Sequence, residues 1–305
     1  MKVDLVHETG DELIVTAARA SFNRRASEYT YKQNDSLTAF LVDSTPPHWA
    51  PLAHVRITLT LPFWGIIYKK LTHLDKAGMK ELRVDLNMIV LSHSLWGWHN
   101  LLKGRKVHFS LVESVIKHLK DTAPVTCEIL NIDQYRSSEK HENGDLPVEL
   151  APYYYATDFV TLRVELPIAM ARQFMKHLVG YVYSEASGRY ITYSKIYTPT
   201  LHGIPKSKKQ GSGDPVGFLR KMLALSLIKT SYFISKLTYN TLHRIVRISA
   251  EEARCVMPMY TGTVFVVTAS REDWDRFLTH RLADDAQTDI RALAKLVDKK
   301  LKEKK

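Results

Sequence analysis

The chain has 305 residues, of which 45% are hydrophobic and 25% charged, a composition typical of a globular protein with a buried core. Its net charge of +11 indicates polyanionic partners, although much of the excess lies in a lysine-rich stretch at 206–213 and in the C-terminal tail. Two cysteines exclude a disulfide scaffold, and no apolar run approaches the roughly 20 residues of a membrane helix.

The N-terminus shows no signal-peptide pattern, and neither Cys127 nor Cys255 stands in a C-x-x-C spacing. We therefore expect a cytoplasmic protein with no membrane partner. His93 and His99 lack the spacing and the acidic partners of a metal site, so no metal is expected.

The first predicted element of the core is a half-buried strand at 54–62, where apolar and polar residues alternate. A strand at 158–167 repeats this alternation and leads through Pro167 into a helix predicted over 168–183. Two further segments, 88–106 and 265–283, each predict a strand, a turn and a helix. Aligning their tryptophans, Trp98 and Trp274, also superposes two serines, a match that either chance or an internal duplication would produce.

The C-terminal half is predicted to be rich in helix. Residues 217–249 are helical, Ser249 begins a capping box, and a strand follows at 262–268. Ser270 then caps a helix, and the last helix covers 289–301. We therefore predict an α+β fold, with a mixed or antiparallel sheet flanked by long helices.

The domain organisation is predicted to be one catalytic domain over 1–305. Residues 62–157 separate the first two strands and are interpreted as an insertion or subdomain. The polar, turn-rich stretches at 137–147 and 206–215 are predicted to be exposed loops, the second of them flexible, and 298–305 is a basic tail.

The stretch RQFMKHLVGYVYSEASGRY (172–190) concentrates groups that bind anions. Gln173 and Lys176 lie on the predicted helix and a Ser-Gly-Arg turn follows at 187–189, which together supply the donors that one phosphate needs. A basic amphipathic helix that ends in an ordinary glycine turn would give the same pattern.

Arg281 extends an apolar stripe that contains Trp274 and Phe277, where a guanidinium is normally excluded unless it has a partner. The alternative is a side chain that snorkels at a helix C-terminus. For Arg254, in the capped helix, the simplest explanation is a surface salt bridge. The sequence contains no G-x-G-x-x-G, P-loop or G-x-S-x-G motif, so dinucleotide-fold, NTPase and α/β-hydrolase functions have no support.

Taken together, these segments resemble the flavin-dependent thymidylate synthases. The family's central motif, RQ-x-x-RHR followed by NE-x-SGRY, resembles RQFMKHLVGYVYSEASGRY at 172–190. Other blocks resemble the family in the same order: TAARASF (16–22), HWAPLAHV (48–55), EEARCVMPM (251–259) and the stretch 265–288.

The resemblance implies a homotetramer that binds FAD and converts dUMP to dTMP, with methylenetetrahydrofolate as the carbon donor and NADPH as the source of hydride. It implies that Arg281 is catalytic, facing the uracil ring and stabilising negative charge on it. It implies that the nucleoside monophosphate is held by Gln173, Lys176, Glu185, Ser187, Gly188, Arg189 and Arg254. It implies that the flavin is held by His54, Lys176, His177, Leu178, Glu185 and Arg271.

The departures from the family pattern lie mostly on the flavin side. Arg-His-Arg has become Lys-His-Leu, which removes one guanidinium at Leu178, and Ala53 stands where the family has Glu. Such divergence suits a phage-type enzyme, or one with an altered pyrimidine substrate or product. A carbon-5 hydroxymethylase or a dCMP-modifying enzyme is therefore an alternative. A non-catalytic basic protein that binds nucleotide or nucleic acid is another, although the mild basicity of the rest of the chain argues against nucleic acid.

Overall fold

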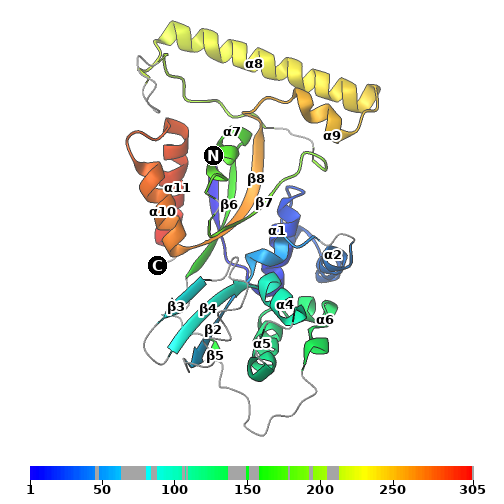
Figure 1. Ribbon diagram of the computed structural model, residues 1–305. Coiled ribbons are helices and arrows are strands. Elements are labelled where there is room, and N and C mark those ends of the chain that lie inside the picture. Colours follow the sequence, from blue (N-terminus) through cyan, green and yellow to red (C-terminus); the bar gives the residue numbers. More distant parts are fainter. Residues whose placement is uncertain are drawn as a thin grey trace. The chain divides into compact units, whose positions relative to one another are not determined.

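The computed structural model describes residues 1–44, 48–62, 80–83, 88–104, 107, 109–136, 149–150, 158–177, 179–191, 195–204 and 213–303. The chain divides into two compact units, each with its own four-stranded sheet. The first unit contains 1–6, 20–24 and 162–305, and the second contains 7–19 and 25–161 (Figure 1). The loop predicted at 137–147 and most of the one predicted at 206–215 lie outside the described residues.

The second unit combines an antiparallel sheet with short helices. Its strands have the order β3-β4-β2-β5, and every pairing within it is antiparallel. The strands are β2 (Arg56–Pro62), β3 (Lys80–Arg83), β4 (Met88–Ser94) and β5 (Glu149–Leu150). The helices are α1 (Gly10–Ala20), α2 (Tyr31–Asp43), α4 (Leu95–Lys103), α5 (Phe109–Thr122) and α6 (Pro124–Ile129), with 3-10 turns at Ala26–Glu28, Pro51–His54 and Ile132–Tyr135.

The first unit has the strand order β1-β6-β8-β7. Its strands are β1 (Lys2–Val6), β6 (Phe159–Pro167), β7 (Tyr181–Glu185) and β8 (Gly262–Ser270). Its helices are α7 (Ile168–Phe174), α8 (Phe218–Asn240), α9 (Ala250–Ala253), α10 (Arg271–Leu282) and α11 (Thr288–Glu303), with a π-helical turn at Thr241–Ile245 and a 3-10 turn at Arg254–Val256. β7 pairs antiparallel with β8, from Tyr181 opposite Ala269 to Glu185 opposite Phe265.

The core of the first unit lies around its two central strands. β6 and β8 are buried along nearly their whole length. β8 contains the continuous apolar run 264–267, whereas β6 also buries the polar residues Thr161 and Arg163. Trp274 and Phe277 of α10 are completely buried. The i, i+3, i+4 pattern of α11 buries a continuous stripe, made by Ile290, Leu293, Ala294, Val297 and Leu301.

The α+β prediction is confirmed, as are the strands predicted near 54–62, 158–167 and 262–268. The helix predicted over 168–183 is wrong beyond Phe174, because residues 181–185 form β7. The backbone of Gly180 has φ +83°, a conformation that ends helical geometry and turns the chain into the strand. The alternating aromatic residues of YVYSE then favour extended structure.

Candidate active site

The turn into β7 depends on Gly180. A Cβ atom at this position would overlap the carboxylate of Asp273, in the first turn of α10. Asp273 is 2% exposed, and its backbone N–H donates to the Oγ of Ser270, the predicted N-cap of α10. The positive φ and this close approach together allow β7 to start directly beside α10.

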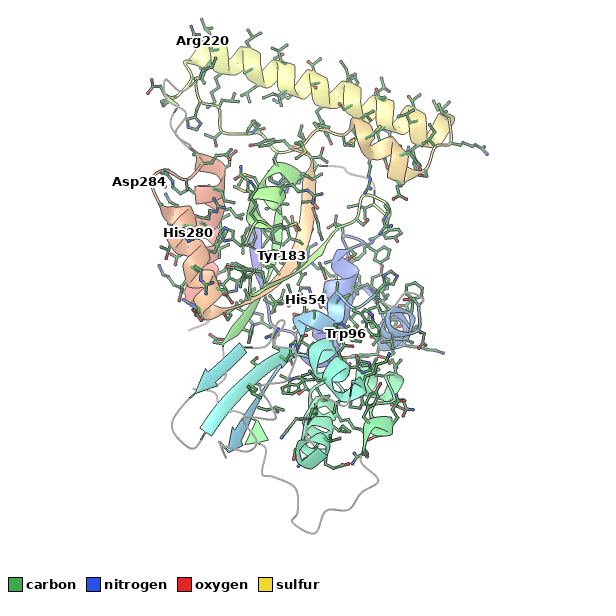
Figure 2. All side chains as sticks on the ribbon, viewed as in Figure 1. His54, Trp96, Tyr183, Arg220, His280 and Asp284 are labelled. Atoms are coloured by element: carbon green, nitrogen blue, oxygen red, sulfur yellow. The ribbon has the colours of Figure 1, made fainter. Side chains whose placement is uncertain are left out.

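Two tyrosines of β7 tie the strand to the ends of two helices. Tyr181 and Tyr183 point to the same face, and their rings stack with centroids 5.9 Å apart. The hydroxyl of Tyr181 donates to the carbonyl of Asp273 at 2.6 Å, and that of Tyr183 donates to the carbonyl of His177 at 2.8 Å (Figure 2 labels Tyr183). Burial raises the pKa of both phenols above the usual value, so both remain hydrogen-bond donors.

Arg281 meets the end of α7. Its Nε donates to the Nε2 of His177 at 3.0 Å, which joins the last turn of α10 to the Lys176–His177 segment. Burial, Arg281 and His280 together lower the pKa of His177 to about 4, so the imidazole is neutral and accepts this bond. The partner that an arginine on an apolar stripe needs is therefore His177.

The Ser-Gly-Arg bend follows directly after β7. The backbone N–H of Ser187 donates to the carbonyl of Ser21 at 2.8 Å, and that of Tyr190 donates to the carbonyl of Ser187 at 3.0 Å, which closes the predicted turn. The N–H of Arg189 donates to the Oγ of Ser187 at 3.3 Å. Gly188 is buried, whereas the guanidinium of Arg189 is exposed, 5.4 Å from the ring centre of Tyr190. The bend thus presents the exposed guanidinium of Arg189 to solvent, next to a hydrogen-bonded backbone turn.

Glu185 lies at the end of β7, immediately before the bend. Its carboxylate accepts a hydrogen bond from the hydroxyl of Thr263 at 3.1 Å. Burial raises the pKa of Glu185, while Arg172 and the Thr263 bond act in the opposite direction. The charge of Arg172 lowers the pKa of Glu185, and His177 accepts a hydrogen bond from Arg281. The short segment 172–177 therefore links the bend to α10.

The other residues predicted to bind the nucleotide are placed as follows. Gln173 donates its side-chain amide to the Oε1 of Gln287, at the start of α11, and Lys176 is exposed. The Nε of Arg254 donates to the carbonyl of Glu251 at 3.0 Å, within the α9 region. The surface salt bridge suggested for Arg254 is therefore replaced by a bond to a backbone carbonyl.

Three further residues were predicted to bind the flavin: Arg271, His54 and Leu178. Nη1 of Arg271 donates to the carbonyl of Leu301 at 2.9 Å, and its Nε lies 3.4 Å from Asp275. His54 is in the second unit and is 1% exposed, and burial lowers its pKa to about 3. Leu178 lies outside the described residues. Their roles in cofactor binding stay predictions.

The sequence interpretation missed Tyr181, Tyr183 and Gln287 as site residues. The spacing of the two tyrosines was a usable signal, because residues i and i+2 of a strand share a face. That signal was hidden by the helix predicted over the same residues.

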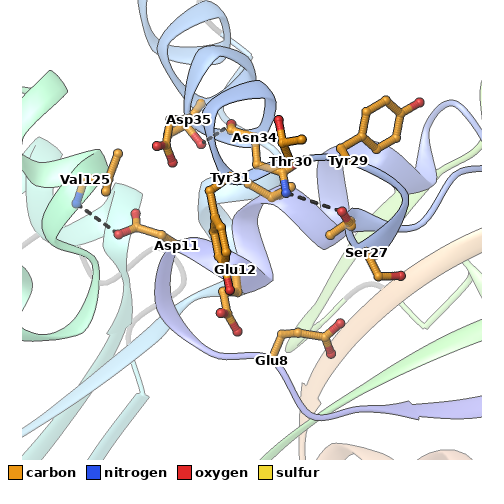
Figure 3. A pocket seen from close by; sticks show the side chains of 13 residues that line it. Glu8, Asp11, Glu12, Ser27, Tyr29, Thr30, Tyr31, Asn34, Asp35 and Val125 are labelled. Atoms are coloured by element: carbon orange, nitrogen blue, oxygen red, sulfur yellow. Dashed lines mark hydrogen bonds between the residues drawn. The ribbon is translucent and has the colours of Figure 1, made fainter.

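The second unit contains a cavity of about 670 Å³ between α1 and α2 (Figure 3). Its lining includes four acidic residues and no Lys, Arg or His, which sets it apart from the basic chain: Glu8, Asp11, Glu12 and Asp35. Asp11 has a structural role, because its carboxylate accepts the backbone N–H groups of Val125 and Thr126 at 3.0 Å each and so caps α6.

None of the described helices is both long and apolar enough to cross a membrane.

The part of the chain that contains this site is similar to known proteins. Residues 158–304 match the family described as thymidylate synthase complementing protein (Thy1). Curated relatives named flavin-dependent thymidylate synthase include the Aquifex aeolicus protein, 29% identical over 153 residues, and the Pseudothermotoga lettingae protein, 32% identical over 135 residues.

These two matches cover 46% and 44% of this chain, and 44% and 57% of the relatives. The chain thus spans about half the length of the curated relatives it matches. Among solved structures, a UMP/dUMP methylase PolB from Streptomyces cacaoi bound with 5-Br UMP is 15% identical, with a TM-score of 0.46 and coverage of 99% of this chain and 88% of that one. All predicted site residues except His54 fall inside the family match.

Proposed function

We propose that this protein is a thymidylate synthase-like enzyme that methylates carbon 5 of dUMP to give dTMP. The observation that carries the proposal is the bond from Arg281 to His177, which connects α10 to the segment that leads into the Ser-Gly-Arg bend. The similarity of residues 158–304 to the Thy1 family supports the same reaction class. The methylene carbon would come from methylenetetrahydrofolate and the hydride from NADPH.

The nucleotide would be bound through its phosphate at the bend. The exposed guanidinium of Arg189 supplies a planar pair of donors for phosphate oxygens, and the hydroxyl of Ser187 lies beside it. The remaining contacts are assigned to Gln173, Lys176, Glu185, Gly188 and Arg254. Arg281 would face the uracil ring, where a fixed cation stabilises the negative charge that develops as the ring is activated.

The flavin predicted from the resemblance, FAD, fits part of the site. His177 is half-buried among Phe174, Tyr181 and Phe277, and Lys176 beside it is exposed, so a planar ring and an anionic group both find partners there. Arg271 donates to the carbonyl of Leu301, and His54 is buried in the second unit. We therefore assign the cofactor contacts to Lys176, His177 and Glu185. A bound flavin would carry the hydride from NADPH.

The spectrum of the purified protein tests this proposal. We expect oxidised flavin absorbance that bleaches when NADPH is added, and a product of dUMP with the mass of dTMP. A product heavier by one oxygen would instead indicate hydroxymethylation, and turnover of dCMP but not dUMP would indicate a cytosine substrate. A colourless protein that cannot be reconstituted with FAD would contradict the proposal and favour a non-catalytic nucleotide-binding protein.

Variants at the bend and at α10 locate the site. We expect Arg189→Ala and Arg281→Ala each to abolish turnover, since each removes a cation that the nucleotide needs. Lys299→Ala, which removes an exposed cation of α11, is the matched control and should turn over dUMP normally. Full activity in both arginine variants would show that the nucleotide binds elsewhere.

We also propose that the enzyme is a homotetramer assembled through α8. This helix leaves large apolar side chains exposed on most of its length: Phe218, Leu219, Met222, Leu223, Leu227, Phe233, Ile234 and Leu237. Exposed apolar area of this extent is typical of an interface, and a second copy of α8 offers the same apolar side chains.

Light scattering tests the assembly. We expect a mass four times the 35.0 kDa of one chain, and a smaller mass for Leu223→Glu. Lys229→Glu, on the same helix, should matter less if apolar contact drives assembly. A monomeric wild type would contradict the tetramer.

The two cysteines are free, which agrees with a reducing compartment such as the cytoplasm.

A further inference from the structure

The bond between Arg281 and His177 uses one defined atom of each side chain. Nε of the guanidinium donates, and Nε2 of the imidazole accepts. The two Nη groups of Arg281 are therefore the ones that remain to meet a ligand. An arginine side chain has several rotatable bonds, and an acceptor at Nε restricts them before any ligand arrives.

The imidazole that accepts this bond is itself held in place. The backbone N–H of His177 donates to the carbonyl of Phe174 at 3.0 Å, and its carbonyl accepts the hydroxyl of Tyr183. Its ring packs edge-on against Phe277, with centroids 5.2 Å apart, and lies 6.1 Å from the ring of Tyr181. His177 is therefore fixed through both its backbone and its ring.

The surroundings of the His177 imidazole, its burial first among them, keep the ring neutral. Arg281 and His280 face it from α10, Tyr181 and Tyr183 face it from β7, and Lys176 precedes it in the chain. Burial of the ring, and next the guanidinium of Arg281, disfavour a positive charge on His177. A protonated ring would also have no lone pair with which to accept from Arg281. The acceptor role is thus maintained at neutral pH.

We propose that His177 is a positioning residue: its Nε2 aims the guanidinium of Arg281 so that both Nη groups meet the pyrimidine ring of the bound nucleotide, and Tyr183 holds His177 for this task. This inference rests on the proposed function, because the target of Arg281 is the nucleotide base. This positioning role is separate from the cofactor contact assigned to His177 above, because Nε2 of His177 already accepts the hydrogen bond from Arg281.

Two substitutions at His177 separate positioning from mere packing. Gln can place an oxygen acceptor near the position of Nε2, whereas Leu fills space without an acceptor. We expect His177→Leu to lower kcat for dUMP by about 10- to 100-fold, the loss of one charge-assisted hydrogen bond, with KM changed by less than about threefold. His177→Gln should recover kcat to within about fivefold of the wild type. Flavin content is measured in each variant, and rates are compared at saturating FAD.

Controls come from the neighbouring residues. His280→Gln removes the other histidine near Arg281 and should leave kcat unchanged within about twofold, because His280 is exposed and its ring centre lies 6.5 Å from that of His177. Tyr183→Phe should lower kcat in the same sense as His177→Leu but less. Equal rates for the Leu and Gln variants, or a wild-type rate for the Leu variant, would overturn the proposal.

A spectroscopic measurement decides the point without turnover. Solid-state nitrogen NMR of histidine-labelled full-length protein should show His177 as the neutral tautomer with its proton on Nδ1, and the signal is assigned by its loss in His177→Gln. A proton on Nε2 at neutral pH would overturn the proposal. If the wild type does not turn over nucleotide, the proposed function fails, and the inference about the base fails with it, while the tautomer still decides whether His177 holds Arg281.

Discussion

Replacing Gly180 with Ala would test how the turn into β7 is built. The backbone there has φ +83°, and the added methyl group would overlap the carboxylate of Asp273. That carboxylate is buried, pairs with Arg276 at 3.3 Å, and belongs to the cap that Ser270 forms at the start of α10. The substitution must therefore strain the backbone and also displace the first turn of the helix.

The loss in free energy of unfolding that these two effects cause can be estimated. A residue with a Cβ in the left-handed region costs about 1–2 kcal/mol. Disturbing the N-cap of α10 costs about 1 kcal/mol, and moving a buried, hydrogen-bonded carboxylate costs about 1–3 kcal/mol more. We expect Gly180→Ala to lower the free energy of unfolding by about 3–6 kcal/mol, a large part of the roughly 5–15 kcal/mol of a typical protein. The midpoint of thermal unfolding should fall by about 10 °C.

Urea unfolding measures this loss. The matched control is Gly203→Ala, because a Cβ there would meet only the carbonyl oxygen of Asp214, at 3.6 Å. In an Asp273→Ala background, Gly180→Ala should cost only the backbone strain, about 1–2 kcal/mol, because the overlapping carboxylate is gone. Equal losses in the two backgrounds would refute the role assigned to Asp273, and a loss no larger than that of Gly203→Ala would refute the whole argument.

Two further outcomes follow from buried polar groups. Asp289→Ala should lower the free energy of unfolding by about 2–3 kcal/mol in urea titrations, because its carboxylate accepts both the backbone N–H and the hydroxyl of Thr200. The free energy of unfolding should also fall as pH decreases from about 6.5 to 5. His54, His99 and His177 have pKa values lowered to about 3, 4 and 4, so the unfolded chain takes up protons that the folded chain does not. Unfolding at pH 7, 6 and 5 checks this, and His99→Phe should flatten the dependence.

Local signals predicted much of the first unit. The serine at 270 predicted a capped helix, and the structure confirms the cap through the Asp273 N–H. The turn predicted at 187–189 is closed by the bond from Tyr190 to Ser187. Both the cap and the turn depend on residues only a few positions apart, so local sequence patterns are sufficient to predict them.

The contacts that join distant segments were beyond such signals. Nothing local to Arg281 indicates that its partner is His177, which lies 104 positions earlier in the chain. The error over 168–183 arose because apolar residues at helical spacing from Ile168 to Val182 outweighed the signals for an ending. The requirement for glycine at 180 comes from Asp273, a neighbour that only the fold supplies.

The two strand-to-helix connections illustrate how local physics can imitate duplication. Ser94 caps α4 and Ser270 caps α10, each directly after an antiparallel strand, and Trp98 and Trp274 are both buried. Their contacts differ, since Trp98 donates its indole N–H to the carbonyl of Ile57, whereas Trp274 packs edge-on against aromatic rings of α7 and β7. A helix that starts at a buried strand end needs a capping side chain, and its inward face needs a large apolar one. Two unrelated connections would therefore satisfy these needs with the same serine and tryptophan.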